Sequence, residues 1–228
     1  MPAIFLIGLF IAFLLPSALG FLLVRFVHRF GESTYVSFLC HTLSNWTTSA
    51  IMLAIILPTI GWDLAEIGFR EVVTPGEIGL ALLFATASIG WFGLNAKLKI
   101  LKMKGPDLRI GNWKHVAILL FSAPITAAFC EEVFYRGFAI TALSSELGNI
   151  WIAGIISSII FALMHIPRYG LGGFVQIGIV GLLLMILFII TGSIFPGILM
   201  HSLNNLFGFV LVPLSRSKAE AHQRQFLP

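Results

Sequence analysis

Long apolar stretches follow one another along this chain, and they restrict its fold more than any other feature. Hydrophobic residues make up 58% of the sequence and charged residues 11%, whereas a soluble domain carries about 25% charged residues. A run of about 20 apolar residues can cross a bilayer as a helix, and inside lipid a helix satisfies its own backbone hydrogen bonds. We therefore predict an all-α, polytopic membrane protein that forms a single membrane domain over residues 1–228.

Hydropathy predicts about seven transmembrane helices. They are Ala3 to Val24, Tyr35 to Ile60, Glu77 to Ala96, Val116 to Leu143, Ile150 to His165, Phe174 to Thr191 and Ser193 to Leu214. In this prediction residues 1–115 form the N-terminal helices and residues 116–214 form the catalytic helices. Residues 215–228 form a solvated cytosolic tail.

The charges between the spans predict the orientation of the chain. The loops after the first and third spans are basic, as is the tail, whereas the loop after the second span and the turn after the fourth are acidic. Basic residues collect in cytoplasmic loops, so we expect the N-terminus outside and the C-terminus in the cytosol. Topology also explains the net charge of +4 better than a nucleic-acid partner, because the basic residues stand at the ends of apolar segments.

Three ionisable residues interrupt the fourth span. Glu131, Glu132 and Arg136 lie within six residues of one another, and each costs at least about 2.5 kcal/mol at the centre of a bilayer. Such residues mark a functional site by default. Glu132 and Arg136 are four residues apart, so on a helix they can form an ion pair, while Glu131 points about 100° away and lacks that partner.

A helical hairpin would bring Glu131 to a histidine. Gly148 marks a turn between the fourth and fifth spans, and it stands 17 residues from both Glu131 and His165. In two antiparallel helices both residues then lie roughly 25 Å from the turn, at the same depth. A carboxylate beside an imidazole is suited to deprotonating water.

The last span carries His201 and Asn205, which share one helical face. Either side chain can stabilise an oxyanion, or His201 can join His165 and Glu131 around a metal. A straight helix beginning after Gly192 would place His201 only about 14 Å deep. The last span is therefore expected to be tilted, broken at 196–197 or re-entrant.

Together these residues resemble the three motifs of the CPBP family. The motifs are Glu131-Glu132-x-x-x-Arg136, Phe161-x-x-x-His165 and His201-x-x-x-Asn205. The family contains intramembrane proteases of the type II CAAX prenyl endopeptidase kind, together with bacteriocin-processing and self-immunity relatives. The resemblance covers residues 121–209 and implies a helical membrane fold with an intramembrane catalytic cavity open to the cytosol. It also implies hydrolysis of a peptide bond near the C-terminus of a substrate.

The resemblance implies a role for each motif residue. Glu131 and His165 activate the water, His201 and Asn205 stabilise the tetrahedral intermediate, and Glu132 with Arg136 orients the site. A zinc ion held by Glu131, His165 and His201 is the alternative, but the HExxH spacing of zinc proteases is absent. We favour a mechanism without a metal cofactor. The expected substrate is a membrane-associated protein or peptide, such as a prenylated CAAX C-terminus or a bacteriocin leader.

Two other classes of function fit the same residues. Intramembrane carboxylates and histidines also serve as proton relays, so a proton-coupled transporter is one alternative. A non-catalytic immunity or partner protein that keeps the fold is the other. Gly170, Gly172 and Gly173 are expected to form a flexible cytosolic turn beside His165, and the loop from 97 to 114 to be solvated or to lie on lipid headgroups.

Overall fold

The described part of the chain is all-α, as the sequence predicts. The computed structural model describes residues 34–56, 63–70, 72–104, 108 and 110–224, with a few isolated positions between 15 and 58. All regular elements in these ranges are helical. Most of the first predicted span, Ala3 to Val24, lies outside the described residues.

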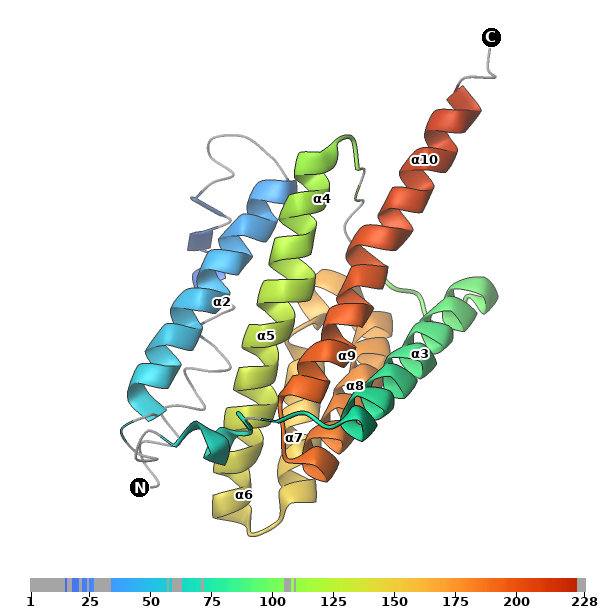
Figure 1. The fold of residues 1–228 in the computed structure, drawn as a ribbon. Coiled ribbons are helices and arrows are strands. Elements are labelled where there is room, and N and C mark those ends of the chain that lie inside the picture. The colour runs from blue at the N-terminus through green and yellow to red at the C-terminus, as the bar shows by residue number, and fades with distance from the viewer. Residues whose placement is uncertain are drawn as a thin grey trace.

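The helices assemble into one elongated bundle (Figure 1). They are α2 (Thr34–Ile56), the 3₁₀ helix η2 (Leu64–Ile67), α3 (Pro75–Leu98), α4 (Trp113–Leu120), the π-helix η3 (Phe121–Ala127), α5 (Ala128–Glu131), the π-helix η4 (Glu132–Ile140), α6 (Thr141–Leu147), α7 (Ile150–Leu163), α8 (Ile166–Thr191), α9 (Phe195–Leu206), the π-helix η5 (Phe207–Leu211) and α10 (Val212–Arg224).

Four helices in the described ranges are long and apolar enough to cross a membrane. They are Pro75–Leu98, Trp113–Leu147, Ile166–Thr191 and Phe195–Ser217, and α7 is a shorter apolar helix. The chain is therefore an integral membrane protein by length and composition of its helices. The number of seven crossings and the orientation of the termini stay predictions.

The predicted hairpin is confirmed. α6 ends at Gly148, whose φ of 66° is the left-handed conformation that glycine adopts at helix ends. Asn149 follows and caps α7, because its side chain accepts hydrogen bonds from the N–H groups of Trp151 and Ile152. The fourth span and α7 thus run antiparallel on either side of a two-residue connection.

The structure departs from the sequence prediction at the start of α8 and decides one alternative at the start of α9. α8 begins at Ile166, so the predicted flexible turn is helical apart from a kink at Gly170, where φ is 69° and ψ is −172°. Of the three alternatives for the last span, the break at 196–197 is absent, because Pro196 occupies the first turn of α9, where its fixed φ favours a helix start. The preceding Gly192 ends α8 with a φ of 63°.

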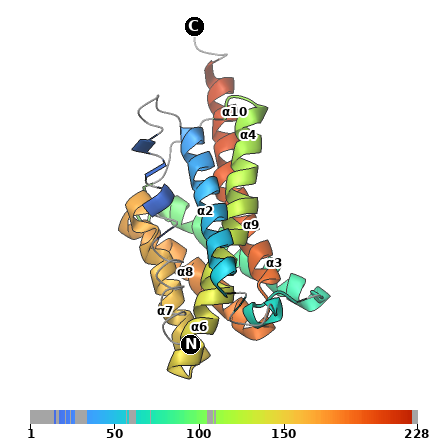
Figure 2. The same ribbon diagram turned by 90° about the vertical axis from the view of Figure 1, so that its left-hand side faces the viewer.

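The N-terminal helices pack directly on the helices that carry the motifs. α2 contacts α4, η3 and α5, and α3 contacts α8 and α9. Figure 2, turned by 90°, shows α2 beside α4 and α10 extending past the end of the bundle. The largest apolar cluster gathers on η4 and α7 around Phe134, Phe138 and Phe161, so the charged motif is built into the best-packed region.

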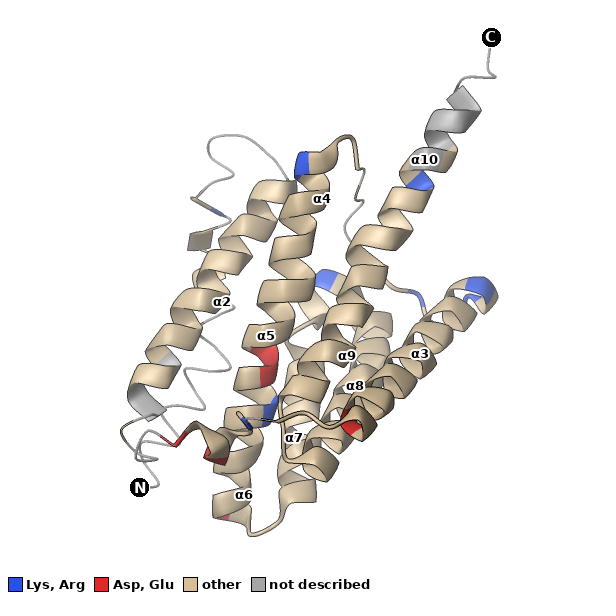
Figure 3. Cartoon of the chain, in the orientation of Figure 1, with Lys and Arg blue, Asp and Glu red and all other residues tan. Residues whose placement is uncertain are grey.

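Charge is segregated along the bundle (Figure 3). Basic segments lie where α3 ends, where α4 begins and on α10, and the loop and helix starts at the other end are acidic. The last helix continues through the predicted tail to Arg224, and Ser215 and Arg216 are exposed there. Its Ser217 hydroxyl accepts a hydrogen bond from the Ile110 N–H, so the loop before α4 packs on protein at this point.

Candidate functional site

Wider helical turns surround the motif residues. Pro124 lies buried within η3, and because proline has no backbone N–H it cannot complete the helical hydrogen-bond ladder there. Side chains from α9 contact the neighbouring carbonyl groups. The Ser202 hydroxyl donates to the Pro124 carbonyl at 2.7 Å, and the Asn205 amide donates to the Ala123 carbonyl at 3.1 Å. These two bonds fix α9 against the fourth span.

Glu132 is the buried centre of the site. Its Oε1 accepts hydrogen bonds from Arg136 at 3.1 Å and from His201 Nδ1 at 2.8 Å, and its side chain is 0% exposed. Within the described residues its Oε2 has no hydrogen-bond partner. This oxygen faces Gly197, where a Cβ would come within 2.9 Å, so glycine is required for α9 to approach so closely.

Arg136 connects the motif helix to α8. The predicted ion pair with Glu132 is confirmed. A second guanidinium nitrogen donates to the Gly181 carbonyl at 3.1 Å, a carbonyl that also accepts the Ser158 hydroxyl. The guanidinium carbon lies 4.6 Å from the centroid of the Phe161 ring, a cation–π distance. These contacts compensate a charge that is 1% exposed.

Glu131 has a different environment from its neighbour. Its side chain is 19% exposed, and its Oε2 lies 3.7 Å from His201 Nε2. That separation is too long for a direct hydrogen bond but leaves both atoms within reach of one bridging water. Because Glu132 takes Nδ1 of His201, Nε2 is the ring nitrogen that faces Glu131. The carboxylate is thus accessible where Glu132 is not.

His165 lies in the two-residue turn between α7 and α8, directly before the first residue of α8. Its Nδ1 lies 2.7 Å from the Phe161 carbonyl. A carbonyl oxygen can only accept, so Nδ1 carries the proton and Nε2 of the neutral ring carries the free lone pair. The Phe161 ring lies between the two histidines, with centroid distances of 4.7 Å to His165 and 6.0 Å to His201.

The structure brings Glu131, Glu132, Arg136 and His201 together, with one difference from the predicted pairing. His165 interacts electrostatically with both Glu131 and His201, but within the described residues no hydrogen bond or ion pair joins it to Glu131. The imidazole that contacts Glu131 is that of His201. Asn205 donates one amide proton to the Ala123 carbonyl, and its second amide proton remains for a ligand.

Several contributors were not identified as site residues from the sequence. Phe161 belongs to the second motif, and its ring contacts Arg136 and both histidines. Ser202 and Gly197 fix the position of α9. The sequence indicates both residues only weakly. Ser202 directly follows His201, and Gly197 follows Pro196 in the first turn of the helix.

The residues proposed for zinc do not fit a metal ion in this arrangement. Nowhere in the described ranges do three or more His, Cys, Asp or Glu side chains form a group that could hold one.

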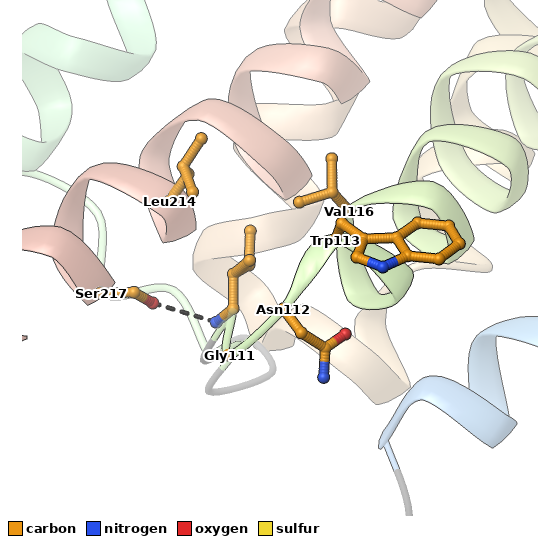
Figure 4. A pocket seen from close by; sticks show the side chains of 7 residues that line it. Gly111, Asn112, Trp113, Val116, Leu214 and Ser217 are labelled. Atoms are coloured by element: carbon orange, nitrogen blue, oxygen red, sulfur yellow. Dashed lines mark hydrogen bonds between the residues drawn. The ribbon is translucent and has the colours of Figure 1, made fainter.

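A pocket of about 350 Å³ lies away from the motif residues (Figure 4). It is formed where the loop before α4 meets α10, and it is lined by Ile110, Gly111, Asn112, Trp113, Val116, Leu214 and Ser217. None of the motif residues contributes to it, so it is not the predicted catalytic cavity, which stays a prediction.

The fold and these contacts define a class of protein: a polytopic helical membrane protein with a buried cluster of carboxylates and imidazoles. Residues 113–207 match the family model described as Type II CAAX prenyl endopeptidase Rce1-like. The resemblance to the CPBP family is thereby confirmed for this stretch, which carries all three motifs. At the level of the family, the match supports a CAAX prenyl protease-like intramembrane endopeptidase. Neither the curated proteins nor the solved structures contain a significant match to the chain.

Proposed function

We propose that this protein hydrolyses a peptide bond within the membrane by water that Glu131 activates. The observation that carries the proposal is the unequal environment of the two adjacent glutamates. Glu132 is fully enclosed by Arg136 and His201, while Glu131 is partly exposed and faces His201 Nε2 at 3.7 Å. A proton acceptor needs access to its substrate, so Glu131 is suited to catalysis and Glu132 to support.

The proposed reaction begins with a water molecule held between Glu131 and the histidines. Glu131 takes one proton from the water as the water oxygen attacks the carbonyl carbon of the substrate. The same proton then passes from Glu131 to the nitrogen of the leaving amine as the C–N bond breaks. His165, with its free lone pair at Nε2, accepts a hydrogen bond from the water and orients it.

His201 and Asn205 are proposed to stabilise the negative oxygen of the tetrahedral intermediate. Because Glu132 accepts the proton on Nδ1 of His201, Nε2 donates to that oxygen when the ring is the imidazolium, with a proton on both nitrogens. The free proton of the Asn205 amide is a second donor. Arg136 keeps Glu132 in place and therefore acts on catalysis through His201.

The proposed substrate is a membrane-associated protein or peptide that is cut near its C-terminus, with a prenylated CAAX sequence as the first candidate. The family match supports this substrate class. We also propose that the basic end of the bundle faces the cytosol, because basic residues collect on that side of membrane proteins. A cytosolic C-terminus follows from that orientation.

The test is cleavage of a fluorogenic CAAX peptide, with and without a prenyl group, by the purified protein in liposomes. Glu131→Gln should lower kcat by at least about 100-fold, since loss of a general base costs 10² to 10⁴. Glu146→Gln, at the exposed α6–α7 turn, is the matched control and should retain activity. Unchanged turnover in Glu131→Gln overturns the mechanism, and proton-driven solute flux without cleavage indicates a transporter instead.

A further inference from the structure

Arg168 is a cation beside the site that the proposed mechanism does not use. It lies in the first turn of α8, three residues after His165, and its side chain is only partly buried. The guanidinium carbon is 4.6 Å from the Phe38 ring centroid and 5.6 Å from that of Phe209. Aromatic faces from two other helices thus hold this charge in place.

The guanidinium of Arg168 has no acidic partner in the described ranges. By contrast, Arg70 pairs with Glu77 at 3.4 Å and Arg136 pairs with Glu132 at 3.1 Å. A guanidinium carries five N–H donors in a planar fork. The aromatic rings contact its face, so the donors along its edge remain for a ligand that is not part of this chain.

The position of Arg168 relates it to the site. The Tyr169 ring is stacked 6.0 Å from the His165 ring and lies 5.5 Å from the Arg168 guanidinium. Together these two distances limit how far the Arg168 guanidinium can be from the His165 ring. Three to four residues of extended peptide, about 10–14 Å long, can cover that separation. A peptide cut beside His165 can therefore reach Arg168 with its last residues.

Lys104, from the loop after α3, packs beside Arg168 and brings a second positive charge. The Tyr169 carbonyl accepts a hydrogen bond from the Lys104 N–H at 3.0 Å. The alkyl chain of Lys104 also lies against Gly170, where a Cβ would be 3.7 Å away. The kink in α8 is thus flanked by two cations, which favours an anionic ligand.

We propose that Arg168 binds the free C-terminal carboxylate of the peptide substrate. A guanidinium fork matches a carboxylate with two parallel hydrogen bonds. Arg168 would hold the C-terminal carboxylate while the catalytic residues hold the scissile carbonyl. The fixed separation of these two sites would place the cleavage a few residues from the end of the substrate. This inference rests on the proposed peptidase function, since it assigns the end of that same substrate.

The experiment compares two peptides that differ only at the C-terminus, one a free acid and the other a primary amide. The wild-type protein should cleave the acid with a kcat/KM about 10- to 100-fold above that of the amide, the range expected for hydrogen bonds to a charged group. Arg168→Gln should lower kcat/KM for the acid to that of the amide and leave the amide unchanged. Arg168→Lys should keep part of the preference.

Arg216→Gln is the matched control, because Arg216 is exposed on α10 and should keep the full preference. Equal cleavage of acid and amide by the wild-type protein overturns the inference while the peptidase function stands, and this comparison requires no folded variant. An equal loss of kcat/KM on both peptides in a folded Arg168→Gln variant also overturns it, since Arg168 then contributes only its packing against the aromatic rings. If the wild-type protein cleaves neither peptide, the proposed function itself fails.

Discussion

Removing the positive charge of Arg136 should destabilise this protein more than most single substitutions. Arg136→Met keeps a long, flexible side chain of helical preference but removes the guanidinium. Glu132, which is 0% exposed, would then have His201 as its remaining partner. The Gly181 carbonyl would still accept the Ser158 hydroxyl at 3.1 Å, so the main defect is the uncompensated carboxylate.

The magnitude follows from the burial of the pair. Breaking a buried ion pair by removing one partner costs about 3–5 kcal/mol, because the other charge stays buried. For a chain of this size, 1 kcal/mol shifts the unfolding midpoint by about 2–4 °C. Arg136→Met should therefore lower the midpoint by about 6–20 °C, and Arg136→Lys, which keeps the charge without the planar fork, by less.

The assay is thermal unfolding of purified protein in detergent, followed by circular dichroism, as a double-mutant cycle. Glu132→Gln removes the carboxylate charge, so the double variant Glu132→Gln with Arg136→Met should be more stable than Arg136→Met alone. Two results would refute the reasoning. The first is an unfolding midpoint within about 2 °C of wild type for Arg136→Met. The second is a loss of stability in the double variant equal to the sum of the losses in the two single variants.

Three further predictions concern close contacts. Gly197→Ala would place a Cβ 2.9 Å from Glu132 Oε2 and should cost about 1–3 kcal/mol of stability, seen as a lower midpoint of thermal unfolding. Gly172→Ala would place a methyl group against a backbone carbonyl of the loop after α3, so this loop should be displaced and limited trypsin digestion should cut it faster. Thr126→Val removes the acceptor of the Trp46 indole N–H, now at 3.0 Å, and should cost about 1–3 kcal/mol in the same unfolding assay.

The controls for the two glycine substitutions lie on α3. A Cβ at Gly79 or Gly90 would meet nothing within 4 Å, and alanine is the better helix former. Gly79→Ala and Gly90→Ala should therefore unfold at or above the wild-type temperature. Equal midpoints for Gly197→Ala and Gly79→Ala would contradict the close approach of α9, and unchanged tryptic cleavage in Gly172→Ala would contradict the packing of the loop. For Thr126→Val, a wild-type midpoint would show that the indole hydrogen bond contributes nothing.

Features carried by a single helix or by adjacent helices could be predicted from the sequence. The Glu132–Arg136 ion pair follows from a spacing of four residues and is present at 3.1 Å. The hairpin at Gly148 follows from a polar turn between two apolar runs, and the structure has it. Helix ends were harder to predict, as the glycines around Gly170 show, because tertiary contacts with the loop after α3 decide whether such a segment stays helical.

The sequence by itself determined that this chain is a helical membrane protein and that charged residues interrupt its apolar spans, and the cost of burying charge in lipid marks those residues as the candidate site. Only the tertiary structure decided how these residues pair. The contact between His201 and the two glutamates depends on the position of α9. That position is set by the close approach at Gly197 and by the hydrogen bond from Ser202 to the Pro124 carbonyl on η3. Spacing along the chain does not encode the rotation of one helix against another, and packing does.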